Sequence, residues 1–265
     1  VLERSKESDL TRMMRFNNIQ TIDTPVTPKK PIGPNLPLNL ALGGALVAIL
    51  FALAALSLAW TPYAPDAIEI AARLQGPSAA HWFGTDPFGR DVLSRLLVGA
   101  RTSITVGLVA VAVGMIAGVA LGALAAARPG WIDELIMGMS DVVFAFPAIL
   151  SALLIAATLG PGPVNAVLAI GIFNIPVFAR VTRRAALTIW SMDYARAAAA
   201  LGQGPWAVTR RHVLPNLAPL LIVQATIQFA VAILAEAALS YLGLGTQPPQ
   251  PSWGRMLNEA QQMLF

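Results

Sequence analysis

The sequence of 265 residues contains no cysteine and only two histidines, His81 and His212. Without cysteine, disulfide bonds and cysteine-ligated metals are excluded, and the redox compartment stays open. Because the two histidines lie far apart in the chain, we expect no metal site and no cofactor bound by this chain.

Charge is scarce as well. Charged residues make up 12% of the chain and hydrophobic residues 56%, whereas soluble domains average roughly 25% charged residues. This composition predicts a membrane protein. The net charge of +4 would also suit a nucleic-acid partner. The arginines, however, lie between long apolar runs rather than along a polar face, so we expect no nucleic-acid partner.

Sequence motifs for bond-breaking chemistry are missing. The chain has no G-x-x-x-x-G-K-[ST] motif to hold ATP phosphates, and no Ser/His/Asp grouping is visible. We therefore predict no catalytic residues, and a chain that is not an enzyme by itself.

Five apolar stretches are long enough, or nearly so, to cross a membrane. A bilayer core about 30 Å thick needs roughly 20 apolar residues in helical form. Pro147 lies in the middle of one stretch and Pro176 interrupts another, and a packed membrane helix tolerates such prolines. The chain is thus predicted to be an all-α polytopic membrane protein with five transmembrane helices, at residues 38–60, 103–127, 135–158, 164–179 and 217–242.

The second of these stretches has glycines spaced four or seven residues apart, at Gly107, Gly114, Gly118 and Gly122. Such spacing allows the backbone of a neighbouring helix to approach closely. A composition rich in alanine and glycine would produce the same pattern by chance, and the sequence leaves both interpretations open.

The distribution of lysine and arginine predicts the orientation. With the N-terminus inside, thirteen of these residues face the cytoplasm and five face outward, in agreement with the positive-inside rule. Residues 1–37 are then a cytoplasmic tail, 38–60 the first transmembrane helix, 61–102 an outer-face segment, and 103–265 a core whose 180–216 loop is cytoplasmic.

Within that loop, the stretch DYARAAAALGQGPWAVTRRHVLPN at residues 193–216 carries most of the charge. Residues 193–201 form a predicted helix that starts at an aspartate. Gly202 is expected at a positive φ after its end, and a second short helix over 206–213 should stop at Pro215. The small face of the first helix, formed by Ala195, Ala198, Ala199 and Gly202, suits docking into a groove on another protein.

This loop resembles the EAA loop of ABC importer permeases, E-A-A-x₃-G-x₉-I-x-L-P. The resemblance departs at Arg196, where glutamate is usual, and at His212, where isoleucine is usual. It implies that the loop couples the chain to ATPases through Asp193, Arg196, Ala197, Ala198, Gly202, Leu214 and Pro215.

Three further stretches resemble the dipeptide/oligopeptide/nickel permease family, its C-type subunit in particular: HWFGTDPFGRDVLSRLLVGARTS, MSDVVFAFPAIL and AEAALSYLGLGTQPPQPSWGRML. The resemblance implies a type I ABC importer permease fold with two short coupling helices. It also implies a subunit for peptides or related small solutes in a bacterial inner membrane. The expected partners are a second permease in a heterodimer, two cytoplasmic ATPases that bind ATP and Mg, and an external binding protein.

The family also has a sixth membrane helix after the QPPQPSWG segment, whereas this sequence ends at Phe265. With five spans and an inside N-terminus, the end of the chain would lie outside. A truncated reading frame or a shortened clone is the expected reason.

Isolated polar residues give the remaining site predictions. Glu236, an acid deep in a span, is expected to line the pathway or the subunit interface, or else to be satisfied by Ser240 four residues on. Asp141, near the inner boundary, is expected to form a pair more readily than to line the pathway.

On the outer face, Asp91 and Arg95 are spaced as an i,i+4 pair on a predicted amphipathic helix. With Trp253 they are candidates for docking the binding protein, and a solvated surface is the alternative.

Two other function classes remain open on the sequence alone. An ion-coupled secondary transporter would need several intramembrane acids and inverted repeats, of which one clear acid and no convincing repeat are visible. A non-transporting membrane assembly is the third possibility.

Overall fold

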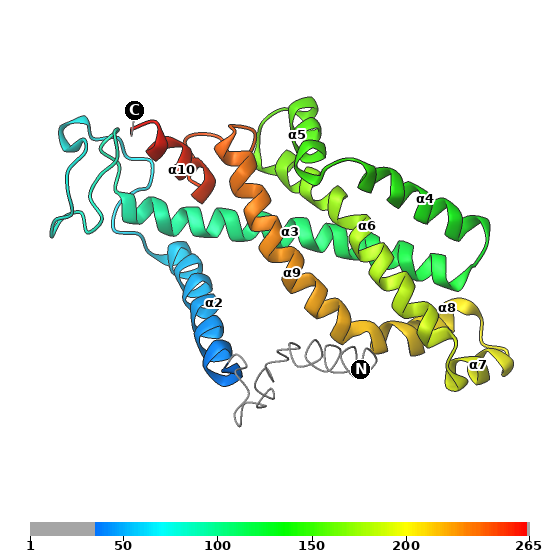
Figure 1. Ribbon diagram of the computed structural model, residues 1–265. Coiled ribbons are helices and arrows are strands. Elements are labelled where there is room, and N and C mark those ends of the chain that lie inside the picture. The colour runs from blue at the N-terminus through cyan, green and yellow to red at the C-terminus, as the bar shows by residue number, and fades with distance from the viewer. Residues whose placement is uncertain (1–34, 264–265) are drawn as a thin grey trace, which may run out of the picture. The chain divides into compact units, whose positions relative to one another are not determined.

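The computed structural model describes residues 35–263, and within this range the protein is helical with no β-strand (Figure 1). The predicted cytoplasmic tail lies almost wholly outside the described residues. In chain order the helices are α2 (Leu36–Ala59), the short η1 (Ile70–Ala72), α3 (Val92–Ala127), α4 (Trp131–Ala145), α5 (Ala148–Leu159), α6 (Pro163–Trp190), α7 (Asp193–Ala200), α8 (Pro205–Val208), η2 (Thr209–Val213), α9 (Leu214–Tyr241) and α10 (Trp253–Gln261).

The chain divides into two units, Val1–Val47 and Ala48–Phe265. Of the first unit, the structure describes the beginning of α2, whose side chains are exposed. Every contact discussed below lies within the second unit.

The membrane-protein prediction is confirmed. Four helices in the described range are long and apolar enough to cross a membrane, or five if the bent pair α4 and α5 forms one span. The third predicted span, 135–158, is therefore not one straight helix. Pro147 takes the N-cap position of α5, and the two pieces meet at 92°, because proline cannot continue the hydrogen-bond ladder of the preceding helix.

Helix α3 is longer than predicted, since the expected outer-face helix and the span that follows it are continuous. Asp91 caps its N-terminus by accepting a hydrogen bond from the Ser94 amide. No proline interrupts the 36 residues that follow, and such a helix is about 54 Å long at 1.5 Å per residue. The predicted boundary at residue 103 thus falls inside a regular helix.

Helices α3 and α6 pack against each other through the glycines of α3. A Cβ placed on Gly118 would lie 2.5 Å from the Ile175 carbonyl oxygen, and one on Gly122 would lie 2.3 Å from that of Ala179. A Cβ on Gly114 would lie 2.3 Å from the Cβ of Asn174. The close-packing interpretation of the glycine pattern is therefore confirmed at these three positions.

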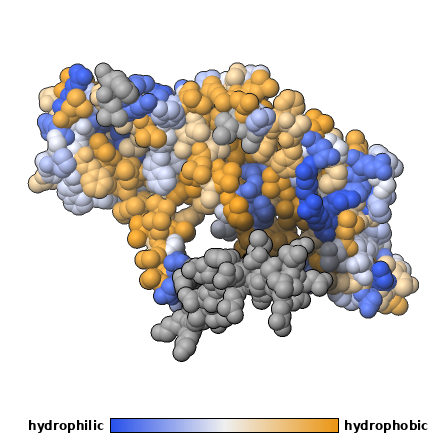
Figure 2. Space-filling model, viewed as in Figure 1, coloured by the Kyte–Doolittle hydropathy of each residue, from blue (hydrophilic) through white to orange (hydrophobic). Residues whose placement is uncertain are grey.

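Hydrophobic side chains dominate the visible surface over the middle of the helices, as Figure 2 shows. Hydrophilic side chains gather near the loop that leads into α3, and near the opposite ends of the helices. This distribution suits a molecule whose middle faces lipid and whose two ends face water.

Candidate functional site

The 193–216 stretch folds as two short helices around a glycine corner, as predicted. Helix α7 begins at Asp193, and Gly202, just past its end, has φ +85°. The Gly202 amide donates to the Ala199 carbonyl at 3.0 Å, and the Gln203 amide donates to that of Ala198 at 3.2 Å. These bonds satisfy carbonyls that the end of a helix leaves without partners.

The small face of α7 does not serve the purpose that the sequence suggested. Ala195 and Ala198 are buried in a cluster with Val208 of α8, against which Trp190 also packs. The prediction that these two alanines dock into another protein is therefore wrong. Their small side chains instead let α7 and α8 lie close together.

The opposite surface of the loop is open and partly apolar. Leu201 is 84% exposed and Trp206 71% exposed, and Asp193, Arg196 and Ala197 are also exposed. Large apolar side chains of this kind, next to charged ones, are typical of a surface that another protein covers.

The prediction that Pro215 stops the second short helix is wrong. The chain runs on from α8 through η2, a π-helical turn, into α9, and Pro215 lies in the first turn of α9. Proline is tolerated there, because its missing N–H is needed least at the start of a helix. The Leu214 amide donates to the Thr209 carbonyl, and this wider turn connects the loop to α9 without a break.

Glu236 is completely buried inside this chain, at 0% exposure. Its carboxylate accepts hydrogen bonds from Ser103 at 2.8 Å and from Ser240 at 2.6 Å, and Thr246 lies 3.4 Å from it. The expectation that Glu236 faces a pathway or a subunit interface is thus contradicted. The alternative, a carboxylate satisfied by Ser240, is what the structure shows, with Ser103 of α3 as a second donor.

Asp141 forms a pair, as expected. Arg180 donates to its carboxylate while the guanidinium lies over the Phe144 ring, 4.3 Å from its centroid. One turn further along α6, Arg183 donates to both carboxylate oxygens of Asp133. These contacts fasten α4 to α6, and because the Asp141 side chain is 71% exposed, its pair contributes little to stability.

The predicted pairing of Asp91 with Arg95 is wrong. Asp91 caps α3, and its Oδ1 lies 3.0 Å from His81 Nδ1. Arg95 instead donates to Glu259 at 2.9 Å and lies 3.6 Å from Asp86. Both predicted docking side chains are 2% exposed, so they offer almost no surface to a binding protein.

Glu259 of α10 joins a network of charges that the sequence analysis missed. Besides Arg95, it accepts hydrogen bonds from Arg90 at 3.0 Å and from Arg255 at 3.1 Å. The third docking candidate, Trp253, is half-buried, and its Nε1 donates to the Leu96 carbonyl at 3.3 Å. These contacts fasten α10 to the start of α3. No sequence signal points to Glu259, which follows Arg95 by 164 residues.

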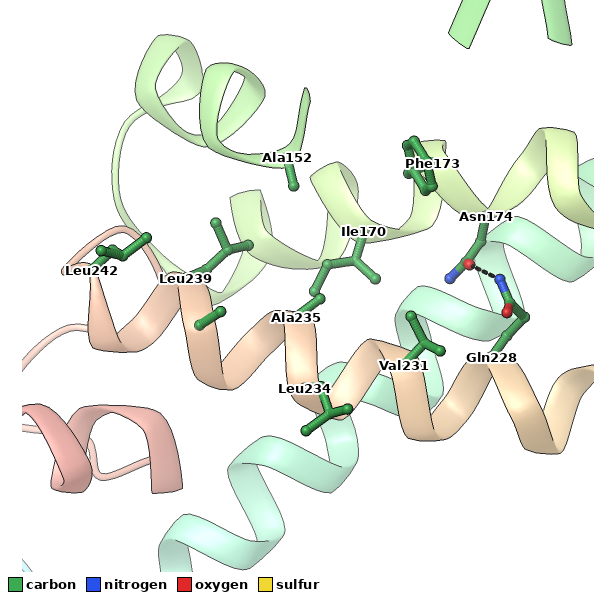
Figure 3. Close-up of a pocket in the computed structure, with 11 residues that line it drawn as sticks. Ala152, Ile170, Phe173, Asn174, Gln228, Val231, Leu234, Ala235, Leu239 and Leu242 are labelled. Atoms are coloured by element: carbon green, nitrogen blue, oxygen red, sulfur yellow. Dashed lines mark hydrogen bonds between the residues drawn. The ribbon is translucent and has the colours of Figure 1, made fainter. Parts of the chain in front are cut away.

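A second feature that the sequence analysis missed is a pocket of about 300 Å³ between α5, α6 and α9 (Figure 3). Its wall is apolar except for two buried amides, Asn174 and Gln228. Gln228 Nε2 donates to Asn174 Oδ1 at 2.7 Å, and Asn174 Nδ2 has no partner in the described residues. The available signal was an amide side chain inside each of two mostly apolar spans, but Asn165 and Gln224 give the same signal, so the pattern alone does not single out Asn174 and Gln228.

Within residues 35–263, no three His, Asp or Glu side chains are grouped so that they could hold a metal ion. The polar side chains described above cap helices, link helices to one another or lie on the surface loop.

Comparison with known proteins agrees with the membrane-spanning helices described above. Residues 118–265 match the profile of the family described as "Binding-protein-dependent transport system inner membrane component". The chain is 45% identical over 187 residues to a glutathione transport system permease protein GsiD of Pectobacterium atrosepticum, covering 71% of this chain and 62% of that protein. It is 47% identical over 192 residues to a dipeptide transport system permease protein DppC of Alkalihalophilus pseudofirmus, with 72% and 63% covered.

The Escherichia coli O157:H7 GsiD protein is 42% identical over 225 residues, with 84% of this chain and 74% of the relative covered. The chain thus spans less than two thirds of the first two relatives and about three quarters of the third. Among solved structures, the methionine ABC transporter MetNI shares the fold with a TM-score of 0.54 at 20% identity, covering 62% of this chain and 79% of that one.

Proposed function

The chain belongs to the family of binding-protein-dependent transport system inner membrane components, and we propose that it is the permease subunit of an ATP-driven importer. The solutes that its relatives are named for, dipeptides and glutathione, contain peptide or amide bonds. We therefore propose peptides or closely related small solutes as the cargo.

One observation carries this proposal beyond the family, namely the open surface of the 193–216 loop. Leu201 and Trp206 project from a corner that Gly202 shapes, and α8 continues through η2 into the candidate span α9. Because α8, η2 and α9 form one continuous helical segment, a displacement of this surface by a docked protein would also move the membrane-spanning part of α9. We propose that two cytoplasmic ATPases, which bind ATP and Mg, dock here, and that a second permease completes the pathway.

The same proposal includes an orientation in a bacterial inner membrane. The loop with Arg196, Arg210 and Arg211 faces the cytoplasm together with the N-terminus, according to the positive-inside rule. The segment before α3 and helix α10 then lie outside, where an external binding protein delivers the solute.

For the pathway, the pocket in Figure 3 replaces Glu236 as the candidate contributed by this chain. Asn174 and Gln228 offer hydrogen-bonding groups in an apolar wall, which suits brief contact with an amide. Gln228→Leu should lower transport per assembled complex, and an unchanged rate would remove the pocket from the pathway.

The decisive experiment is reconstitution. The complex of this chain, its partner permease and the ATPases encoded beside it is purified and then reconstituted into liposomes. Uptake of a peptide is measured with and without ATP. We expect uptake to require ATP and the binding protein, and the isolated chain to hydrolyse no ATP. Uptake by the chain alone, driven by an ion gradient, would establish the secondary-transporter alternative instead.

A further inference from the structure

A small pocket lies where α2 ends and α3 begins, in the loop region drawn in cyan in Figure 1. Its volume is about 240 Å³. Three of its lining residues are aromatic and one is an acid: Trp60, Tyr63, Trp82 and Asp91, with Pro62, Ala80 and Leu93 completing the wall. Neither the coupling loop nor the pocket in Figure 3 contributes to it.

The aromatic rings are exposed, and one of them is held firmly. Trp60, Tyr63 and Trp82 are all among the exposed large side chains. The Tyr63 hydroxyl donates to the Ala80 carbonyl at 2.9 Å, and its backbone amide donates to Ser94 Oγ at 3.0 Å. Its ring lies against the His81 imidazole, with 4.6 Å between the centroids. The tyrosine face is thus fixed before any ligand arrives.

The acid in the pocket, Asp91, has one basic side chain within 4.0 Å among the described residues, His81, which balances its charge only when the imidazole is protonated. Asp91 Oδ2 accepts hydrogen bonds from the amide and the hydroxyl of Ser94, at 2.8 and 2.7 Å, and Oδ1 contacts His81. Within residues 35–263, no Lys or Arg nitrogen lies within 4.0 Å of this carboxylate. The neighbouring Arg90 and Arg95 are engaged by Asp86 and Glu259.

Aromatic faces and a carboxylate favour the same kind of ligand. The face of an aromatic ring carries negative potential and attracts an ammonium group, more strongly as water is removed. The Asp91 side chain is 2% exposed and lies in the pocket wall, so it acts on a ligand through its negative potential, which disfavours phosphates and carboxylates, rather than as a freely accessible partner. A neutral apolar molecule would use the rings but gain nothing from Asp91.

We propose that this pocket binds a compact organic ammonium group, such as the one in ethanolamine or choline. Trp60 directly follows the last residue of α2, a candidate membrane span, and tryptophan favours the membrane–water interface. A phospholipid headgroup and a free amine in the outer medium both present this chemistry at that level. The site is independent of the importer function.

The test uses the complete complex in detergent without amine headgroups, with choline as the probe. Its uncharged carbon isostere, dimethylbutanol, has the same shape without the charge. Calorimetry or tryptophan fluorescence should show saturable choline binding, with the isostere about tenfold weaker or more, because cation–π and ionic attraction are absent. Equal binding of the two compounds, or no binding of choline, would overturn the proposal.

Two variants locate the site. Asp91→Asn keeps the cap of α3, since asparagine is also a good N-cap residue, but it removes the charge and should reduce the preference for choline over the isostere to the part that the aromatic rings supply. Trp82→Leu should weaken choline about tenfold, whereas Trp82→Phe, which keeps a ring, should weaken it less. Unchanged choline affinity in both Asp91→Asn and Trp82→Leu would contradict the assignment.

Two membrane compositions identify the source of the ammonium group. In nanodiscs of phosphatidylglycerol alone, choline should bind as it does in detergent. If nanodiscs containing phosphatidylethanolamine suppress this binding, the headgroup occupies the pocket. If choline binds equally in both, the natural ligand is a free amine. Both results support an ammonium site, and absence of choline binding in both would overturn it.

Discussion

Where α3 begins and α10 packs against it, arginine and carboxylate side chains are buried against one another, whereas at the far ends of α3 and α9 the loop leaves Leu201 and Trp206 exposed. The first region uses its polar groups to hold the chain together. The second region exposes large apolar side chains to water, which is unfavourable unless another protein covers them. The contrast supports the proposal that a partner covers the second region, whereas the first stabilises the subunit by itself.

The substitution expected to destabilise the packing of α10 against the start of α3 most is Glu259→Gln. Three guanidinium groups, those of Arg90, Arg95 and Arg255, share this carboxylate. Neutralising it leaves Arg90 and Arg95 with Asp86 and leaves Arg255 with no carboxylate within 4.0 Å among the described residues. Removing one partner of a buried ion pair costs about 3–5 kcal/mol, and we expect a loss near the lower limit because Glu259 is partly accessible.

Thermal unfolding of the purified variant in detergent measures this loss. Glu69→Gln is the matched control, because Glu69 is exposed and its side chain forms no ion pair in the part of the chain that the structure describes. A stability equal to that of the control would show that the charge network does not hold α10.

Glu236→Gln should have the next largest effect. The glutamine amide nitrogen would face a serine hydroxyl that now donates to a carboxylate oxygen, so about 1–3 kcal/mol is lost. The yield of assembled complex should fall while transport per complex stays unchanged. The opposite result, normal yield with slow transport, would support a role for Glu236 in the pathway. It would also contradict the view that the buried polar groups of this region serve only to stabilise the subunit.

At the loop, Gly202→Ala tests conformation alone. No atom lies within 4 Å of the position that a Cβ would occupy, but φ is +85°, which costs a residue other than glycine about 1–2 kcal/mol. Gly204→Ala is the control, because Gly204 has φ −65° and equally open space. ATP-driven transport should fall in the first variant only, and equal rates would argue against a coupling role for the corner.

Leu201→Ser should have the smallest effect on stability, within about 0.5 kcal/mol of the parent, because the leucine is almost fully exposed. It should nevertheless weaken retention of the ATPases on an affinity column. Full retention together with normal transport would show that the exposed leucine is ordinary surface.

Local patterns explain which features the sequence predicts. The positive φ of Gly202 follows from a glycine at the end of an alanine-rich helix, and the close approach of α3 to α6 follows from Gly114, Gly118 and Gly122. Apolar length alone identifies most of the spans.

Features that depend on tertiary contact were missed or misassigned. Glu236 looks like a pathway acid until Ser103, 133 residues earlier, is seen to donate to it. Arg95 has an aspartate four residues before it, but Glu259 of a distant helix reaches it instead. Pro215 resembles a helix stop because a π turn before it leaves no mark in the residue pattern.

The most direct test of the central claim uses the absence of cysteine from the chain. Leu201→Cys and Leu257→Cys each introduce a single thiol at an exposed leucine, one on the coupling loop and the other on α10. After treatment of the assembled complex with a short bifunctional thiol reagent, we predict a cross-link to an ATPase subunit from Leu201→Cys and none from Leu257→Cys. A cross-link from position 257, or none from position 201 in a complex that transports normally, would contradict the account.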